Sequence, residues 1–224
     1  MEWHKRAEMK WDAYAENWSS NAQQMWENGS RKEIIPFFVK HVPKQGSVCD
    51  LGCGDGYGTM KLHSEGYDVV GLDLSNEMVE MAKKRTNYTV DFIQGDISTL
   101  PFASEEIEAV MVINAIEWTE NPFSTLEEIR RVVKKGGHAC FGILGPTAAP
   151  RVANSYHRLY GEKIVMNSML PWEFERLALE NGWSLVDELW VEKKEAKREQ
   201  LMHLPKELQQ SLSFMWLFML KKID

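Results

Sequence analysis

The sequence predicts an α/β fold, a doubly wound sandwich with a parallel sheet over residues 45–145. Short, continuously apolar segments alternate with helical segments through this region. Strands of that kind are buried on both faces, which is typical of a parallel sheet covered by helices on each side. A further observation is the glycine-rich turn "DLGCGDGYG", directly after the first apolar segment. In parallel sheets, ligands bind at such turns, beyond the carboxyl ends of the strands.

The core elements follow from apolar runs and helix signals. The expected strands cover 47–52, 68–74, 88–96, 108–118 and 138–145, and the expected helices cover 58–66, 75–85 and 121–137. Ser75 is the expected N-cap of the second helix, and Asn121 with Pro122 opens the third. Gly66 and Gly136 are expected to end the first and third helices.

Different patterns flank this core. Residues 1–44 are expected to be helical, and 146–169 to be irregular. After them we expect helices over 170–183 and 205–211 and strands over 184–194 and 213–222, with Gly182 ending the first of these helices.

The composition argues against several classes of protein. A net charge of −7 without a basic run disfavours a general nucleic-acid binder. Three cysteines, Cys49, Cys53 and Cys140, provide no disulfide framework and no zinc-type spacing. The N-terminus lacks the apolar segment of a signal peptide, and the apolar run 214–220 is too short to cross a bilayer. We therefore expect a cytoplasmic protein without a metal site, a nucleic-acid partner or a membrane partner.

The glycine turn differs from a dinucleotide-binding fingerprint. That fingerprint, G-x-G-x-x-G, uses its third glycine to bring the helix close beneath a pyrophosphate. Gly52 and Gly54 match the first two positions, but Tyr57 stands at the third. Asp50 would repel a phosphate and suits a ligand that carries positive charge. A tight strand–helix turn with no ligand is the alternative interpretation.

Two carboxylates follow the next two expected strands. Asp73 can accept hydrogen bonds from both hydroxyls of a ribose, and a bond to a charged group contributes roughly 1.5–3 kcal/mol. Asp96 can accept from an adenine amine while Ile97 packs on the ring. Helix capping by Asp73 and turn formation by Asp96 are the alternatives. With the glycine turn, these residues describe a pocket for adenosine with a cationic, phosphate-free extension, which is the chemistry of S-adenosylmethionine.

Four segments resemble the class I S-adenosylmethionine-dependent methyltransferases, in order and at the spacing of that family. They are "VCDLGCGDG", "VVGLDLS", "FIQGDISTLPF" and "LEEIRRVVKKGGHACF". The resemblance is strongest to the small-molecule branch that includes the ubiquinone and menaquinone methyltransferases. It implies a Rossmann-like fold with a mainly parallel seven-stranded sheet, a helical N-terminal lid and an antiparallel C-terminal strand. It also implies S-adenosyl-L-methionine as cofactor and a small molecule as methyl acceptor.

Under this resemblance, residues 1–224 form a single domain. Its expected parts are a helical lid (1–44), a cofactor-binding core (45–145), an acceptor-side insert (146–170) and C-terminal helices and strands (171–224).

The resemblance implies roles for individual residues. The methionine part of the cofactor would lie along Asp50, Gly52, Cys53 and Gly54. Asp73 would hold the ribose, Leu74 and Met78 would lie beside the adenosine, and Asp96 and Ile97 would hold the adenine. Asn114 and Ala115 would lie near the sulfonium, and Tyr14 and Trp18 are candidate lid residues. An aromatic face near the sulfonium would contribute about 0.5–2 kcal/mol, although a Tyr14–Trp18 stripe is also typical of a helix core face.

The acceptor and the catalytic groups are less defined. His157 is a weak candidate for a general base, and an exposed loop histidine is the alternative. The "NPF" at 121–123 is similar to the amine-site loop of amino-methyltransferases, but helix capping also explains it. The expected reaction is methyl transfer to an O, N, C or S atom of an unidentified acceptor, with no prediction of oligomeric state. The alternatives are a non-catalytic S-adenosylmethionine-binding regulatory protein and a nicotinamide-dependent oxidoreductase, which Tyr57 disfavours.

Overall fold

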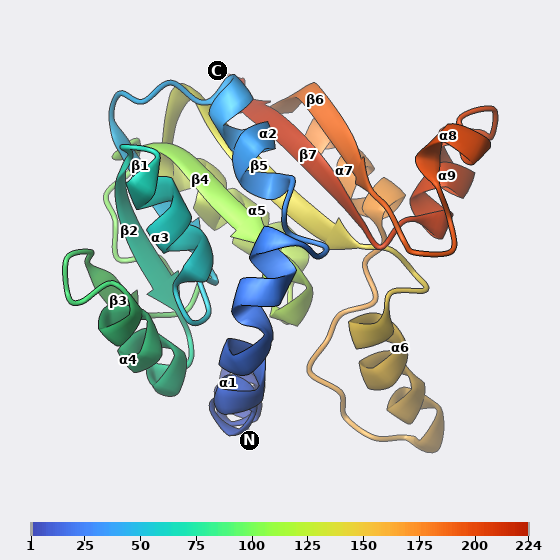
Figure 1. Ribbon diagram of the computed structural model, residues 1–224, viewed down its shortest axis with the longest axis horizontal. Helices are drawn as coiled ribbons and strands as arrows, with labels where there is room; N and C mark the ends of the chain where they lie inside the picture. The colour runs from blue at the N-terminus through green and yellow to red at the C-terminus, as the bar shows by residue number, and fades with distance from the viewer. Residues whose placement is uncertain (1, 224) are drawn as a thin grey trace.

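The computed structural model describes residues 2–223, in which seven strands form one mixed sheet (Figure 1). Its order is β3-β2-β1-β4-β5-β7-β6. The strands are β1 (Ser47–Leu51), β2 (Asp68–Asp73), β3 (Phe92–Gln94), β4 (Ile107–Ile113), β5 (Val133–Leu144), β6 (Trp183–Val191) and β7 (Met215–Lys222). Strands β1 to β5 pair in parallel, and β7 is antiparallel to both β5 and β6. The expected seven-stranded sheet with an antiparallel C-terminal strand is confirmed.

Helices cover both faces of this sheet (Figure 1). They are α1 (Trp3–Glu27), α2 (Ile34–His41), α3 (Tyr57–Ser64), α4 (Asn76–Arg85), α5 (Pro122–Val132), α6 (Ala149–Ser155), α7 (Pro171–Glu180), α8 (Arg198–Leu201) and α9 (Lys206–Leu212), with 3₁₀ turns η1 (Ile116–Trp118) and η2 (Tyr156–Tyr160). One apolar cluster joins α2, α3 and α4 to the sheet, for example through Phe38 and Leu62. A second joins α5 and α7 to the other face, through Leu126 and Phe174.

The predicted helix starts of the core are confirmed. The Ser75 hydroxyl accepts a hydrogen bond from the backbone N–H of Met78 at 3.1 Å and caps α4. The Asn121 side chain accepts from the N–H of Ser124 at 3.1 Å, and Pro122 is the first residue of α5. Both caps satisfy N–H groups that the first helical turn leaves without partners.

Three core boundaries were predicted wrongly. The third strand holds only Phe92–Gln94, because Asn87 and Tyr88 adopt left-handed φ angles of 50° and 59°. The fourth ends at Ile113, because Asn114 has a φ of 53°. Helix α5 ends at Val132 rather than at Gly136, because buried Val133 pairs with Ile107 of β4 and starts β5. Residues 134–137 then form a bulge before His138 resumes pairing with Ala109.

The flanking segments also differ from the expectation. The 146–169 stretch, expected to be irregular, contains α6 and η2, and α8 lies in a stretch for which no helix was predicted. The N-terminal segment is helical as expected. The N-terminal half of α1 lies near the ends at which β2 and β4 finish (Figure 1). This position places α1 beside the edge of the sheet where ligands of parallel sheets bind. No helix among residues 2–223 combines the length and the apolar character needed to cross a membrane.

Candidate functional site

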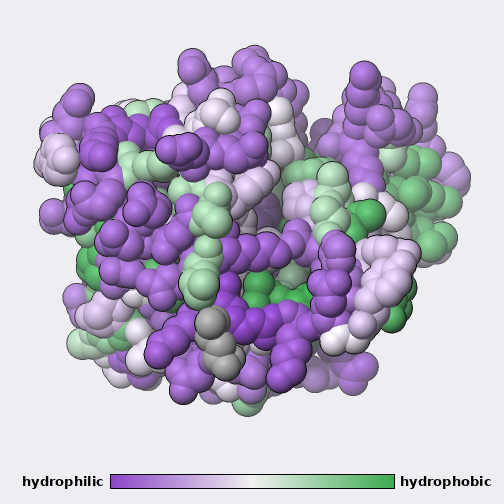
Figure 2. Space-filling model, turned by 90° about the horizontal axis from the view of Figure 1, so that it is seen from below, coloured by the Kyte–Doolittle hydropathy of each residue, from purple (hydrophilic) through white to green (hydrophobic). Residues whose placement is uncertain are grey.

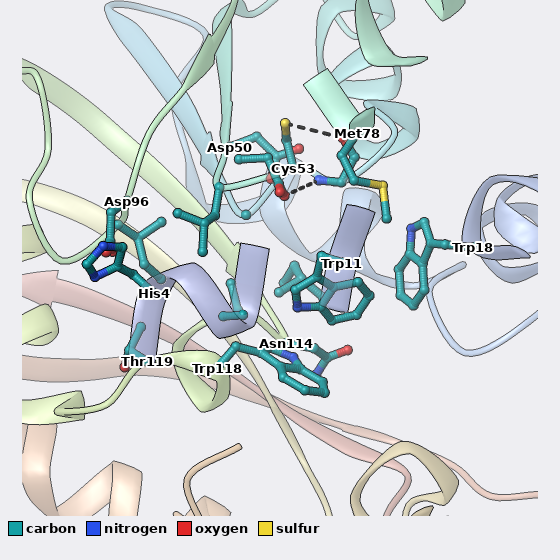
Figure 3. Close-up of a pocket in the computed structure, with 18 of the residues that line it drawn as sticks. His4, Trp11, Trp18, Asp50, Cys53, Met78, Asp96, Asn114, Trp118 and Thr119 are labelled. Atoms are coloured by element: carbon teal, nitrogen blue, oxygen red, sulfur yellow. Dashed lines mark hydrogen bonds between the residues drawn. The ribbon is translucent and has the colours of Figure 1, made fainter. Parts of the chain in front are cut away.

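A cavity lies beyond the carboxyl ends of β1, β2, β3 and β4, beneath α1 (Figure 3). It encloses about 1120 Å³ of space, including its open mouth. Of the thirteen residues predicted to bind the cofactor, all except Tyr14 line this cavity. Loops that are far apart in the sequence therefore bring the predicted residues to one place, as the parallel topology requires.

The three glycines of the turn have different structural reasons. All have positive φ angles, 75° at Gly52, 54° at Gly54 and 75° at Gly56, where a side chain would be strained. A Cβ at Gly52 would lie 2.4 Å from the Cβ of Ala115, and one at Gly56 would lie 2.6 Å from the Cβ of Ala82. Gly52 and Gly56 thus permit close packing within the protein. Gly52 and Gly54 both line the cavity, and at Gly54 the nearest atom to a Cβ would be Nε1 of Trp18 at 3.2 Å, so its bare backbone leaves room for a ligand.

Asp73 is held by the backbone in a single orientation. Its Oδ2 accepts from the N–H of Gly54 at 2.8 Å, and its Oδ1 accepts from the N–H of Ser75 at 2.9 Å. Burial raises the pKa of Asp73 to about 6, although these backbone hydrogen bonds oppose the rise. Gly54 and Ser75, the N-cap of α4, hold the Asp73 carboxylate in place. This carboxylate lines the cavity and is therefore a fixed acceptor for ligand hydroxyls.

Asp50 is a deeply buried carboxyl of the cavity. It is buried and accepts a hydrogen bond from the hydroxyl of Thr59 at 2.7 Å. Burial raises its pKa to about 7, against the effects of the Thr59 hydrogen bond and of Arg31. A ligand that brings positive charge near Asp50 would favour its ionised form.

These two carboxyls give a testable pH dependence of stability in the ligand-free protein. Their pKa values of about 7 and about 6 exceed those of an unfolded chain, about 4. The folded chain therefore holds protons that the unfolded chain releases, and this stabilisation, present at low pH, is lost as the pH rises through 6 to 7. We expect Asp50→Asn to gain stability relative to the wild type between about pH 5 and about pH 8. Denaturant unfolding of both proteins across this range measures it, and a constant difference would contradict the raised pKa.

Asp96 and Asn114 occupy two other edges of the cavity. The Oδ1 of Asp96 accepts from the N–H and the hydroxyl of Ser98, at 2.8 and 2.7 Å. Ile97 beside it is buried, and His4 of α1 lines the same cavity. Asn114 donates through Nδ2 to the carbonyl of Gly142 at 3.0 Å, so its amide is oriented by β5. The cavity thus offers carboxylate acceptors at one end and a fixed amide at the other.

Helix α1 covers the cavity with a stripe of tryptophans. Trp3, Trp11 and Trp18 line the cavity, and the Trp11 ring lies edge-on to Trp118, with centroids 4.8 Å apart. Buried alanines alternate with these tryptophans at steps of three or four residues, in the order Trp3, Ala7, Trp11, Ala15, Trp18, Ala22 and Trp26. This repeat is the sequence signal that could have identified the whole lid face.

The structure places the two predicted lid residues differently. Trp18 lies 3.2 Å, through its Nε1, from where a Cβ of Gly54 would be. Tyr14 is 48% exposed and packs only edge-on against Trp11, with ring centroids 6.1 Å apart. Of the two, only Trp18 therefore faces the cavity.

Polar contacts fasten the N-terminal half of α1 over the cavity. The hydroxyl of Ser75 donates to Asp12 at 2.5 Å, and Gln94 donates to Glu8 at 3.1 Å. On the other side, the indole N–H of Trp3 donates to the carbonyl of Trp118 at 2.7 Å. The helix is thereby attached to the N-cap of α4 after β2, to the end of β3 and to η1 after β4.

Arg31 is a cavity residue that sequence reasoning missed. It follows α1, is only 8% exposed, and its guanidinium lies 4.8 Å from the ring centroid of Trp18. Its Nη2 donates to Oδ1 of Asn114 at 3.2 Å, and among residues 2–223 no carboxylate lies within 4.0 Å of it. Burial lowers its pKa to about 10. A buried guanidinium without a carboxylate partner is costly and suits an anionic ligand group. The surrounding sequence, "SRKE", contains no motif that would identify Arg31 as a ligand-binding residue.

The other candidate residues, His157 and Asn121, lie outside the cavity. His157 is on η2, outside the cavity, with its Nδ1 3.4 Å from Oε1 of Glu162 on the surface. Asn121 uses its side chain to cap α5, which supports the capping interpretation of "NPF". Within the described part of the chain, no group of three or more potential metal ligands occurs.

Comparisons with known proteins agree with this geometry. Residues 49–141 match the family described as "Methyltransferase domain". Malonyl-[acyl-carrier protein] O-methyltransferase of Erwinia pyrifoliae is 33% identical over 113 residues, which cover 50% of this chain and 42% of that protein. Demethylmenaquinone methyltransferase of Renibacterium salmoninarum is 35% identical over 106 residues, covering 47% and 44%. The alignments span about half or less of these curated relatives.

Solved structures show the same fold over nearly the whole chain. The putative methyltransferase complexed with the Haloferax volcanii Trm112 activator superposes with a TM-score of 0.71 at 21% identity, covering 96% of this chain and 98% of that one. The [4+2]-cyclase SpnF superposes with a TM-score of 0.64 at 15% identity, covering 88% and 82%. At these identities the likeness concerns the fold.

Proposed function

We propose that this chain, whose residues 49–141 match the family described as "Methyltransferase domain", is a class I S-adenosylmethionine-dependent methyltransferase that binds its cofactor in the cavity beneath α1 and transfers the methyl group to a small molecule. The observation that carries the proposal is the convergence of Gly54, Asp73, Asp96 and Arg31 on one cavity. These residues supply free space, two carboxylates and one cation, which are the groups that an amino acid carboxylate and an adenosine would use.

The cavity fits the cofactor in two independent respects. Gly54 presents bare backbone to the space, which any side chain would fill. Arg31 is buried and lines the cavity, and within the described residues it has no carboxylate partner. The carboxylate of the methionine part would supply that partner. A pyrophosphate would instead meet Asp50 and Asp73, which disfavours the nicotinamide alternative.

The proposed binding roles follow the cavity from end to end. Asp96 and Ile97 would hold the adenine, Asp73 the ribose hydroxyls, and Leu74 and Met78 would pack beside the adenosine. The methionine part would lie along Asp50, Gly52, Cys53 and Gly54, with its carboxylate on Arg31. Asn114 and Ala115 would lie nearest the methyl group. Trp11 and Trp18 are the proposed lid residues, because both line the cavity, whereas Tyr14 does not.

When bound, S-adenosylmethionine supplies a methyl group already activated by its sulfonium. The chain's contribution is then to position the reactants and exclude water, and well-aligned systems gain roughly 7–11 kcal/mol from positioning. Asn114, held by Gly142 and Arg31, fixes the β4 turn at the methyl end. Trp11 and Trp118 close the cavity on that side and limit access of water. Glu117 is buried and bonded to the N–H of Leu144, so no group of this turn is assigned as a general base.

The Arg31 assignment predicts a ligand-dependent loss of affinity. We expect Arg31→Met to weaken S-adenosylhomocysteine binding by about tenfold to a hundredfold, because a hydrogen bond to a charged group contributes roughly 1.5–3 kcal/mol. Binding of 5′-methylthioadenosine, which lacks the amino-acid part, should stay within about twofold of the wild type, because none of its groups would contact Arg31. Calorimetry with both ligands measures the difference. Equal losses for both ligands would contradict the carboxylate role, and Lys32→Met is the matched control.

The proposed function is tested by binding and by turnover. S-adenosylmethionine and S-adenosylhomocysteine should bind in calorimetry while NADH does not, and a broad acceptor panel should release S-adenosylhomocysteine. NADH binding without S-adenosylmethionine binding would support the oxidoreductase alternative. Cofactor binding without turnover would support a regulatory protein, or another reaction on this fold such as that of the cyclase named above.

A small-molecule acceptor is favoured over a macromolecule by the covered cavity and the net charge of −7. The named relatives act on different acceptors, malonyl-[acyl-carrier protein] in one case and demethylmenaquinone in the other. The identity of the acceptor therefore has to come from the acceptor panel and is not taken from a relative.

A further inference from the structure

The segment formed by α6 and η2 presents an exposed apolar cluster. Val152, Tyr156, Leu159 and Tyr160 have relative exposures between 53% and 69%. The rings of Tyr156 and Tyr160 pack edge-on with centroids 5.5 Å apart, and their hydroxyls are 3.0 Å apart. The cluster therefore has a defined arrangement at the end of a projecting segment. Contiguous exposed apolar side chains of this kind mark interaction surfaces.

Lys and Arg residues occur in the segment that carries this cluster and at the start of α1. Residues 3–10 and 154–163 together contain five Lys or Arg residues against two Glu, although the whole chain has a net charge of −7. Within the described residues, Lys5, Arg6 and Lys163 have no carboxylate within 4.0 Å. The two glutamates are engaged, Glu8 with Gln94 and Glu162 with His157. Both glutamates keep their negative charge in these contacts, and exposed Glu2 precedes the first segment, so residues 2–10 and 154–163 together carry a net charge of +2.

Both segments lie at the same end of the molecule. The Nζ of Lys10 on α1 donates to the side chain of Asn154 on α6. Figure 1 shows the start of α1 and α6 at the lower end of the structure. Figure 2 looks onto that end, where hydrophilic side chains surround a hollow and apolar surface appears within it and towards the side of α6. Since Trp3 and His4 line the cavity, this end also carries a border of the cavity mouth.

We propose that this surface, the basic-aromatic rim made by the exposed side chains of residues 3–10 and 152–163, docks on an anionic phospholipid bilayer. Aromatic and aliphatic side chains insert at the headgroup boundary while neighbouring Lys and Arg contact anionic headgroups. This contact needs no spanning helix, and the proposal departs from the sequence-based expectation of no membrane partner. Resting on the proposed function, it further identifies the acceptor as an apolar, lipid-dissolved molecule that reaches the cavity from the bilayer.

Vesicle binding of the full chain tests the docking. We expect at least tenfold tighter binding to vesicles of equimolar phosphatidylcholine and phosphatidylglycerol than to phosphatidylcholine alone, and weaker binding as salt is raised. Leu159→Asp and the double variant Lys5→Glu, Lys163→Glu should each lose at least tenfold in co-sedimentation. Leu208→Asp, at an exposed leucine of α9 (51% exposed against 68% for Leu159), and Lys194→Glu are the control variants and should bind as the wild type does.

The possible results separate docking from cofactor binding. S-adenosylhomocysteine affinity, measured by calorimetry, should be unchanged in every variant, which shows that each one folds. Vesicle binding without any cofactor binding would leave the docking standing and contradict the proposed function. Absence of binding to anionic vesicles, or equal losses in the control variants, would overturn the docking. A wild-type dimer in light scattering that Leu159→Asp converts to a monomer would also overturn it, because a second copy would then cover the rim.

Discussion

Gly54→Val is expected to abolish binding of S-adenosylmethionine. Gly54 lines the cavity with a φ of 54°, and a Cβ there would already lie 3.2 Å from Nε1 of Trp18. The two methyl groups of valine would extend into the space assigned to the methionine part. A β-branched residue also resists a positive φ, so the turn itself would be strained. Calorimetry should detect no binding at ligand concentrations at which the wild type is saturated.

Gly66→Val separates loss of space from backbone strain. Gly66 also has a positive φ, 89°, but nothing lies within 4 Å of where its Cβ would be. This control should lose a comparable amount of stability to the strain while keeping its affinity for the cofactor. Circular dichroism establishes that both variants are folded. Retained binding by folded Gly54→Val would contradict the placement of the cofactor along the turn.

Asp73→Ala is expected to weaken S-adenosylmethionine binding by at least tenfold. The substitution removes the acceptor for the ribose hydroxyls, and each lost bond to the carboxylate costs about 1.5–3 kcal/mol. It also releases the N–H groups of Gly54 and Ser75, so the turn that faces the methionine part loses its anchor. The fold should survive, because the hydroxyl of Ser75 still caps α4.

The matched control for this variant lies on the same strand. Asp68 is the first residue of β2 and is exposed, so Asp68→Ala should bind the cofactor as the wild type does. Calorimetry with S-adenosylhomocysteine and with adenosine gives the comparison, since both contain the ribose. Unchanged affinity of Asp73→Ala for these ligands would refute the ribose assignment.

Sequence reasoning succeeded where local chemistry decides the structure. Ser75 and Asn121 are short polar residues that can cap only the helices that follow them, and both do so. The site residues at strand ends could also be anticipated, because a parallel sheet brings its carboxyl ends to one edge. Asp50, Asp73 and Asp96 therefore line one cavity although the chain separates them by 23 residues at each step.

The remaining features depend on tertiary contacts that no local pattern shows. Helix α5 stops at Val132 because Val133 is buried against Ile107, a contact between segments that are distant in sequence. Arg31 lines the cavity because of the way the segment between α1 and α2 folds against the sheet. The polar residues around it in the sequence give no sign of this position. Tyr14 and Trp18 alone do not define the lid face, which follows from the full alternation of tryptophan and alanine along α1.

The tryptophan stripe has an optical consequence. Five of the nine tryptophans of the chain, Trp3, Trp11, Trp18, Trp26 and Trp118, line the cavity, and the other four lie outside it. Most of the intrinsic fluorophores therefore surround the volume that a ligand would fill. Occupation of the cavity would change their emission directly, so the unmodified protein can report its own binding equilibria without a label.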